Sequence, residues 1–131
     1  MSKSAILCVD DETIVLESLE VQFQKTFGDT YLYEFAESAD EALEIIDELA
    51  EDNVKILVIV SDWLMPGMKG DEFLICVHEK FPKIVKVMLT GQADREAIDR
   101  LRAEANLYQC FYKPWDGGEL MNTIKAALES S

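Results

Sequence analysis

The chain has 131 residues, of which 49% are hydrophobic and 29% charged, a composition typical of a globular protein rather than a disordered one. Acidic residues outnumber basic ones by 26 to 12, which gives a net charge of −14. Such a surface repels phosphate backbones and anionic lipid headgroups, so we expect no nucleic acid and no membrane among the partners. We expect a single domain over residues 1–131, with its core at about 4–128 and no output domain in this chain.

The three cysteines favour a reducing compartment. They stand at positions 8, 76 and 110, widely spaced and odd in number, and none belongs to a CxxC pair. Such a set is typical of small buried hydrophobic residues rather than of a disulfide framework. The first residues, MSKSAILCVDDE, turn acidic after one short apolar run and do not resemble a signal peptide. No apolar run approaches the roughly 20 residues of a membrane-spanning helix. We therefore expect a cytoplasmic protein.

Short apolar runs alternate with segments of helical periodicity. In chain order the sequence predicts strand 5–9, helix 16–27, strand 31–36, helix 42–49, strand 56–60, helix 73–81, strand 84–89, helix 97–105, strand 108–112 and helix 120–128. The runs at 5–9, 56–60 and 84–89 are too continuous for strands with one face in water, and are typical of strands covered by helices on both faces. Repeated alternation of this kind predicts an α/β fold with a doubly wound, parallel, five-stranded sheet in the order 2-1-3-4-5.

Polar residues stand where the predicted strands end. The first, third, fourth and fifth strands are followed in turn by Asp10-Asp11-Glu12, Ser61-Asp62, Thr90-Gly91 and Lys113-Pro114. Ligands of open parallel sheets bind outside the carboxyl ends of the strands, where the strand order reverses. Strands one and three are neighbours at that point. We therefore expect Asp10, Asp11 and Asp62 to lie together, beside a hydroxyl group and an ammonium group.

Three clustered carboxylates predict a cation. Two unit charges about 4 Å apart interact by about 4 kcal/mol at an effective dielectric constant of about 20, so a proton, a lysine or a hard cation has to offset their repulsion. Mg²⁺, or another divalent ion such as Mn²⁺, takes oxygen ligands of this kind. A carboxylate beside such an ion is also a nucleophile towards phosphorus. We expect Asp62 to be presented to solvent rather than buried, with Gly67 and Gly70 allowing the following loop to stay close.

Four segments of the sequence resemble the receiver domains of two-component response regulators. They are ILCVDDE, VIVSDWLMPGMKGDEFL, VMLTGQAD and FYKPW, and they occur in order at the spacing of one domain. The resemblance extends from Ser4 to about Leu128. It implies the flavodoxin-like (βα)₅ fold and a role as a phosphoprotein in two-component signalling or a phosphorelay. It also implies a module that promotes its own phosphorylation and dephosphorylation without turning over a separate substrate, and is in that sense not an enzyme.

The resemblance assigns roles to the residues that follow the first and third strands. Asp62 corresponds to the family's phosphoacceptor. Asp10 and Asp11 correspond to the acidic pair that holds Mg²⁺, together with Asp62 and the backbone carbonyl of Leu64. The implied phosphodonor is a histidine kinase or a phosphotransfer protein.

The resemblance also implies a conformational switch. Thr90 corresponds to the hydroxyl residue that turns towards the phosphoryl group, and Lys113 to the lysine that pairs with that group, before a cis peptide bond to Pro114. The family usually has an aromatic residue three positions before the lysine, where this chain has Cys110, so the usual coupling between the aromatic ring and the hydroxyl is in doubt. The implied signalling face combines helix 97–105, strand 108–112 and helix 120–128. It would bind a downstream protein target, an output domain or a second copy in a homodimer.

Other interpretations of the same residues remain open at this point. Asp10 or Asp11 is a candidate N-cap of the first helix, and Asp62 a candidate turn residue. One functional alternative is a degenerate receiver that docks without phosphorylation. Another is a small Mg²⁺-dependent phosphohydrolase with an aspartyl phosphate intermediate, although the haloacid dehalogenase-like pattern needs an aspartate where Glu12 follows Asp10. A nucleotide or flavin carrier is disfavoured, because neither GxGxxG nor GxxxxGK[ST] occurs.

Overall fold

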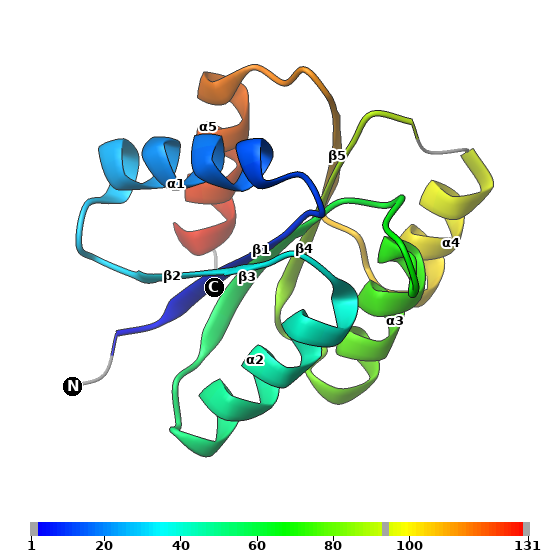
Figure 1. Ribbon diagram of the computed structural model, residues 1–131, viewed down its shortest axis with the longest axis horizontal. Helices are drawn as coiled ribbons and strands as arrows, with labels where there is room; N and C mark the ends of the chain where they lie inside the picture. Colours follow the sequence, from blue (N-terminus) through cyan, green and yellow to red (C-terminus); the bar gives the residue numbers. More distant parts are fainter. Residues whose placement is uncertain (1–2, 93–94, 130–131) are drawn as a thin grey trace.

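Strands and helices alternate along the whole described part of the chain (Figure 1). The computed structural model describes residues 3–92 and 95–129. Its elements are β1 (Ala5–Val9), α1 (Thr13–Phe27), β2 (Leu32–Ala36), α2 (Ala39–Glu51), β3 (Ile56–Ser61), α3 (Gly70–Lys80), β4 (Val85–Thr90), α4 (Arg95–Glu104), β5 (Gln109–Tyr112) and α5 (Gly117–Glu129). Each strand and helix that the sequence predicts is present, with bounds that differ mainly at the helix starts.

The strands form one parallel sheet in the order β2-β1-β3-β4-β5, which confirms the predicted topology. β1 lies between β2 and β3, and its register with β3 shifts between Ala5 and Ile6. Since the strands are parallel, all their carboxyl ends lie at the same edge of the sheet. The chain order reverses between β1 and β3, so the ends of these two strands border the crevice where doubly wound sheets bind ligands.

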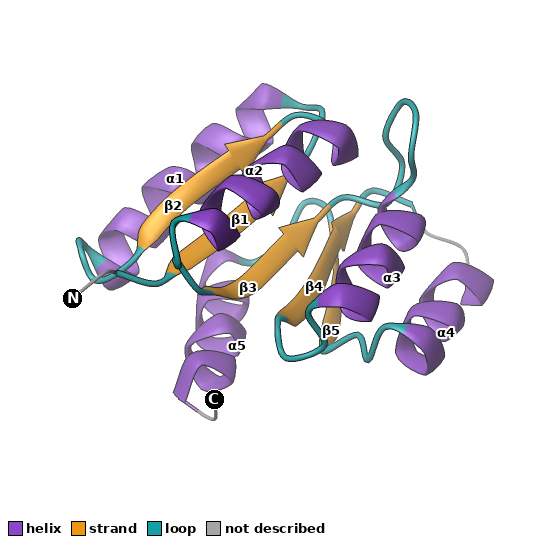
Figure 2. Cartoon of the chain, turned by 90° about the horizontal axis from the view of Figure 1, so that it is seen from below, coloured by secondary structure: helices purple, strands orange, loops and turns teal. Residues whose placement is uncertain are grey.

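Helices cover both faces of the sheet. α1 and α5 lie on one face, and α2, α3 and α4 lie on the other (Figures 1 and 2). Each face has its own core: Phe23 and Leu120 belong to the cluster beneath α1 and α5, while Phe73 and Leu101 belong to the cluster beneath the other three helices. This double coverage explains the continuous apolar runs of β1 and β3, because successive side chains of a strand point to opposite faces and both faces are buried.

Local signals set the ends of the helices. The Ser38 hydroxyl accepts a hydrogen bond from the Glu41 amide at the start of α2. α1 ends at Gly28, whose φ of 57° lies in the left-handed region that glycine adopts without strain. The interpretation of Asp10 or Asp11 as the N-cap of α1 is wrong, because the cap position is Glu12, which makes no side-chain capping bond.

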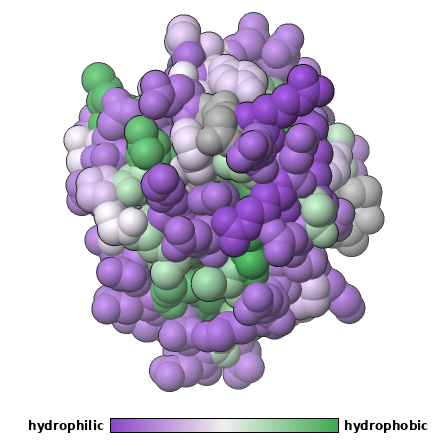
Figure 3. All heavy atoms as spheres, turned by 90° about the vertical axis from the view of Figure 1, so that its right-hand side faces the viewer, coloured by the Kyte–Doolittle hydropathy of each residue, from purple (hydrophilic) through white to green (hydrophobic). Residues whose placement is uncertain are grey.

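The described residues contain no helix that is both long and apolar enough to cross a membrane. The side of the molecule that carries α3 and α4 is largely hydrophilic, with small hydrophobic areas between the polar ones (Figure 3). Among the charged residues that are buried, Lys86 in the middle of β4 is the only cation in the described part of the chain, at 1% exposure.

Candidate functional site

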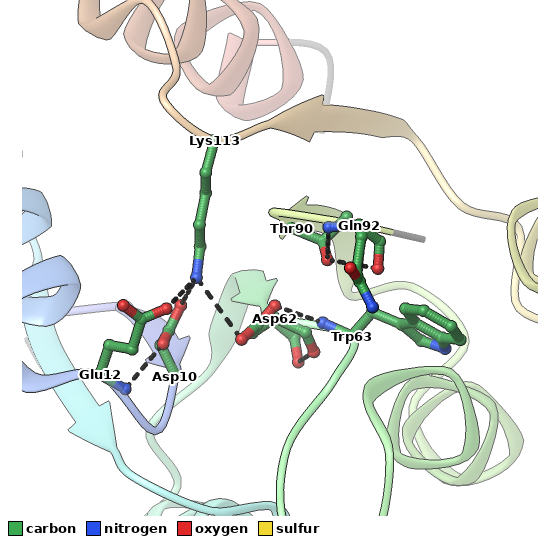
Figure 4. Close-up of polar contacts among 8 residues, drawn as sticks. Asp10, Glu12, Asp62, Trp63, Thr90, Gln92 and Lys113 are labelled. Carbon is green, nitrogen blue, oxygen red and sulfur yellow. Dashed lines mark hydrogen bonds and ion pairs between the residues drawn. The ribbon is translucent and has the colours of Figure 1, made fainter. Parts of the chain in front are cut away.

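The residues that follow the strands meet at the carboxyl edge of the sheet (Figure 4). The backbone itself brings them together. The Asp62 amide donates to the Val9 carbonyl oxygen at 2.9 Å, and the Lys113 amide donates to the Thr90 carbonyl oxygen at the same distance. The end of β3 is thus tied to the end of β1, and the end of β5 to the end of β4. The predicted convergence of Asp10, Asp11, Asp62, Thr90 and Lys113 therefore occurs.

Four carboxylates form the centre of the site. One carboxylate oxygen from each of Asp10, Asp11, Glu12 and Asp62 lies within 4.8 Å of the other three. Glu12 was not among the predicted ligands, although it is the third member of the acidic run after β1. Asp10 and Asp62 are buried, whereas Asp11 and Glu12 are exposed. The cluster therefore has two oxygens fixed inside the protein and two at its mouth.

Lys113 is the cation that balances part of this charge. Its Nζ atom lies 2.8 Å from Asp10 Oδ2, 3.1 Å from Glu12 Oε1 and 3.5 Å from Asp62 Oδ2. Burial lowers the pKa of Lys113, but the hydrogen bonds to Asp10 and Glu12 outweigh that effect and raise the pKa above its ordinary value. One ammonium group faces four carboxylates, so the cluster keeps a net negative charge.

Burial raises the pKa of both inner carboxyl groups. For Asp10, the hydrogen bonds from Lys113 and from the Glu12 amide oppose this rise, and the charge of Asp62 adds to it. For Asp62, the charge of Lys113 and the hydrogen bond from the Trp63 amide oppose it. The two carboxylates repel each other inside a partly desolvated pocket, which is where a further cation is most stabilising.

The expectation that Asp62 is presented to solvent is wrong. The residue is only 5% exposed. The Trp63 amide holds Oδ1 at 2.8 Å, while Lys113 lies over Oδ2, so the carboxylate lies at the bottom of the pocket with its oxygens already oriented. A strand end can therefore deliver a reactive group into a recess, because the neighbouring strand ends and their side chains rise around it.

Thr90 ends β4, the neighbour of β3, and its hydroxyl is turned to its own loop (Figure 4). Oγ1 donates to the Gln92 carbonyl oxygen and accepts from the Gln92 amide, both at 3.3 Å. These distances are long for hydrogen bonds, so the hydroxyl is weakly held. Ala93 and Asp94, the last residues of the VMLTGQAD motif, lie outside the described residues. The Leu64 side chain is exposed, and its backbone belongs to the loop that leaves Asp62.

The loop between β3 and α3 returns close to the Asp62 backbone at Gly70. The Gly70 amide donates to the Trp63 carbonyl oxygen at 2.7 Å. A Cβ atom at Gly70 would overlap the Asp62 carbonyl oxygen and would lie 2.8 Å from Trp63 Cα. Gly67 has a φ of 83°, a conformation that favours glycine. The prediction that these two glycines keep the loop near Asp62 agrees with this geometry.

The fifth strand combines an expected and an unusual feature. The peptide bond between Lys113 and Pro114 is cis, as the resemblance implies. Cys110 is half-buried against the core beneath α2, α3 and α4, and burial raises the pKa of its thiol. Tyr108 and Tyr112 flank it at a spacing of two residues and are 45% and 54% exposed. Tyr112 points to the same face as Cys110, because side chains of a strand alternate, whereas Tyr108 lies just before β5.

The donor set suits a hard divalent cation. Mg²⁺ binds through one or two carboxylates and keeps several waters, and this cluster offers two fixed carboxylates and two exposed ones. The described residues contribute no histidine or cysteine to this cluster, which a softer metal would prefer. The pocket can therefore hold a small cation beside Asp62 and attract a group that carries further oxygens.

Comparison with known proteins identifies the family. Residues 6–125 match the sequence model described as "Response regulator receiver domain". The chain is 34% identical over 128 residues to the hydrogenase transcriptional regulatory protein HoxA of Cupriavidus necator, an alignment that covers 98% of this chain and 25% of HoxA. It is 31% identical over 126 residues to the sensor kinase CckA of Brucella abortus, covering 96% of this chain and 13% of CckA. The chain thus spans a quarter or less of these relatives.

Solved structures agree with the sequence comparison. A CheY-like response regulator receiver domain protein from Methanospirillum hungatei superposes with a TM-score of 0.84 at 29% identity, covering 98% of this chain and 96% of that one. The receiver domain of an HD domain-containing protein from Pseudomonas fluorescens superposes with a TM-score of 0.83 at 28% identity, covering 98% and 97% of the two chains.

Proposed function

Because the chain belongs to the family of response regulator receiver domains, we propose that it is a phosphorylation-dependent switch whose phosphoacceptor is Asp62. The observation that carries this proposal is the position of the Asp62 carboxylate. It lies in the pocket at the strand ends, 3.5 Å from Lys113 Nζ and within one cluster with Asp10, Asp11 and Glu12. In this arrangement a carboxylate nucleophile is accompanied by a cation and by oxygen ligands for a metal.

Mg²⁺, or Mn²⁺ in its place, is the cofactor that we propose for the pocket. Asp10, Asp11 and Asp62 would hold it, with the Leu64 carbonyl as a further ligand and Glu12 near enough to contribute through water. When bound, the ion neutralises charge on the phosphoryl oxygens during transfer. The excess of carboxylates over ammonium groups in the cluster supports this assignment.

The reaction that we propose is transfer of a phosphoryl group from a phosphohistidine to Asp62. An Asp62 carboxylate oxygen attacks phosphorus, the bond from phosphorus to the histidine nitrogen breaks, and an acyl phosphate forms. Asp62 must be ionised to attack. Lys113 and the Trp63 amide favour that state, because both oppose the rise in pKa that burial causes. Lys113 Nζ also lies where it can pair with a phosphoryl oxygen.

The phosphoryl group would act as a switch through Thr90. Its hydroxyl is weakly bound to Gln92 and can turn to a phosphoryl oxygen, which would shift the loop between β4 and α4. We infer that the α4-β5-α5 face transmits this change to a downstream protein or output domain, or to a second copy in a homodimer. The phosphodonor would be a histidine kinase or a phosphotransfer protein in the cytoplasm.

Phosphorylation by acetyl phosphate tests the proposal. With Mg²⁺, we expect the intact mass to rise by one phosphoryl group, and hydroxylamine to remove it as it does acyl phosphates. Asp62→Asn should abolish labelling. Asp71→Asn is the matched control, because Asp71 is also a buried aspartate but lies in α3 outside the acidic cluster. Labelling that persists in Asp62→Asn would refute the assignment.

A further inference from the structure

A second concave site lies at the opposite end of the sheet. It is a groove of about 920 Å³ at the amino ends of β3 and β4, the tails of these arrows in Figure 2, where the end of α2 and the loops before β3, β4 and β5 meet. Its apolar walls include Ile46, Val54, Ile56, Phe81 and Ile84. This volume is in the range of ligand pockets, which is roughly 300–1,000 Å³. The acidic cluster lies at the opposite edge of the sheet, at the carboxyl ends of β1 and β3.

The charge of the groove is opposite to that of the molecule. Lys55, Lys80 and Lys83 line it, and none of the described residues that line it is acidic. In the whole chain, by contrast, acidic residues outnumber basic ones by 26 to 12. A quarter of the basic residues thus gather around one apolar groove, so the groove combines an apolar interior with a cationic rim.

A fourth lysine, Lys86, bonds to the backbone of residues that line the groove. Lys86, 1% exposed, donates from Nζ to the carbonyl oxygens of Ile84 at 2.7 Å and Pro82 at 3.5 Å, and both of these residues line the groove. Among the contacts described for this ammonium group, none is to a carboxylate. Burial lowers its pKa to about 8, so it still carries charge near neutral pH. A buried cation without an anionic partner favours an anion nearby.

We propose that this groove binds a small amphipathic anion, an organic acid with an apolar alkyl or aryl body. The apolar body would lie against Ile56, Phe81 and Ile84, and the acid group would face the ammonium groups of Lys80 and Lys83. The concave shape and volume of the groove suit a small molecule, because pockets of this volume enclose most of the surface of such a ligand. This site is independent of phosphorylation at Asp62.

A fluorescent probe tests the proposal directly. The aryl sulfonate 8-anilinonaphthalene-1-sulfonate should bind saturably, and octanoate below its micellar concentration should displace it. Octanol, which has the same chain length but no charge, should displace it at least about tenfold more weakly, because it forms no ion pair. Backbone amide shifts on octanoate binding should centre on Asn53, Lys55 and Ile84. Shifts centred elsewhere, or equal displacement by octanol, would overturn the proposal.

Two kinds of variant separate the effect of the lysine charges on binding from the effect of the shape of the groove. Lys80→Gln with Lys83→Gln should weaken octanoate binding by about tenfold, whereas the matched pair Lys25→Gln with Lys125→Gln, two exposed lysines outside the groove, should not. Ala50→Phe should block binding by filling the groove while every lysine remains. Ala50 is exposed near the end of α2, so this variant should fold. Unchanged binding in both the lysine variant and Ala50→Phe would overturn the assignment.

Discussion

Lys113 shows how one side chain sets the charge of the pocket. Its ammonium group touches Asp10, Glu12 and Asp62, which come from the ends of two different strands. It therefore stabilises the unphosphorylated site while occupying part of the space that a metal and a phosphoryl group would use. The same contacts oppose the rise in the pKa of both buried aspartates. Removing Lys113 should affect metal binding and switching in opposite directions.

We predict that Lys113→Met tightens Mg²⁺ binding at pH 8 while it weakens the response to phosphorylation. Loss of a unit positive charge about 4 Å from a divalent ion is worth about 2 kcal/mol in a water-like medium, or roughly thirtyfold in affinity. Mg²⁺ titration followed by the fluorescence of Trp63, whose amide bonds to Asp62, measures the change. Lys125→Met, in the exposed face of α5, is the control. Weaker Mg²⁺ binding would show instead that Lys113 organises the metal site.

We predict that Gly70→Ala impairs the site through the backbone. The new Cβ atom would collide with the Asp62 carbonyl oxygen, so the loop after β3 would have to move away from the carboxylate. We expect a loss of about 1–3 kcal/mol in the free energy of unfolding and slower phosphorylation by acetyl phosphate. Gly91→Ala is the control, because a Cβ atom there meets nothing within 4 Å. Equal behaviour of the two variants in denaturation and labelling would contradict this account.

At the residue scale, the sequence predicts which side chains come together at the strand ends. It predicts less well how exposed those side chains are. Position after a strand is a local property, so Asp10, Asp62 and Lys113 could be placed from the pattern of apolar runs. The burial of Asp62 depends on Trp63, Lys113 and the neighbouring strand ends acting together, which no local pattern records. The sequence did not predict Glu12 as part of the site, because exposed glutamates are common at helix starts. Its contact with Lys113 is visible only in the structure.

At the element scale, β4 and β5 are the strands through which the pocket can reach the α4-β5-α5 face. Thr90 pairs with Tyr112 in the register of these strands, and Met88 pairs with Cys110. Cys110 stands where the family usually has an aromatic residue, but it lies two pairs away from Thr90 in this register. Tyr112 is directly opposite Thr90 and more than half exposed. If Thr90 acts as the proposed switch, Tyr112 is the aromatic residue that pairs with it in the register.

We predict an energetic coupling between Thr90 and Tyr112. A double-mutant cycle of Thr90→Ala and Tyr112→Leu, measured by chemical denaturation, should give an interaction energy of about 0.5 kcal/mol, typical of paired side chains on neighbouring strands. The same cycle with Tyr108→Leu should give a value near zero, because Tyr108 lies before β5, four residues from the Tyr112 position that pairs with Thr90. A larger coupling to Tyr108 would place the sensing group at the other end of the strand.

The hydrophobic periodicity of the sequence predicts every strand and helix, but it does not predict one feature of β4. The run IVKVML predicts a buried strand in spite of its lysine, and that prediction is confirmed. What the sequence could not predict is that Lys86 stays inside. Its ammonium group donates to the carbonyl oxygens of Pro82 and Ile84, which belong to the turn that precedes the strand. A lysine that bonds to its own turn has no signature in the order of hydrophobic and polar residues.

At the scale of the whole molecule, the acidic excess is unevenly distributed over the two ends of the sheet. Four carboxylates gather at the carboxyl ends of the strands, and three lysines line the groove at the amino ends. The buried part of the acidic cluster destabilises the metal-free fold near neutral pH. Because burial raises the pKa of Asp10 and Asp62 in the folded state, their contribution to stability is full below pH about 4 and is lost as the pH rises through the raised pKa values.

Mg²⁺ should therefore stabilise the protein in a pH-dependent way. At about 100 times its dissociation constant, a ligand of the folded state adds about 2.7 kcal/mol, which for a domain of this size raises the Tm by roughly 10 °C. We expect this rise at pH 7.5, a smaller one at pH 5 and none near pH 4, since protonated carboxyl groups do not bind the ion. Thermal denaturation with KCl at matched ionic strength as the control measures the difference.

Asp62→Asn separates two causes of the pH-dependent stability: binding of Mg²⁺ and protonation of the buried carboxyl groups. Without Mg²⁺, the variant should have a higher Tm than the original chain at pH 7.5, because it lacks one of two mutually repelling buried carboxylates. Near pH 4 the two Tm values should approach each other, and added Mg²⁺ should raise the Tm of the variant less at every pH. A Tm increase with Mg²⁺ that is independent of pH and unchanged in Asp62→Asn would mean that the ion binds away from the strand ends.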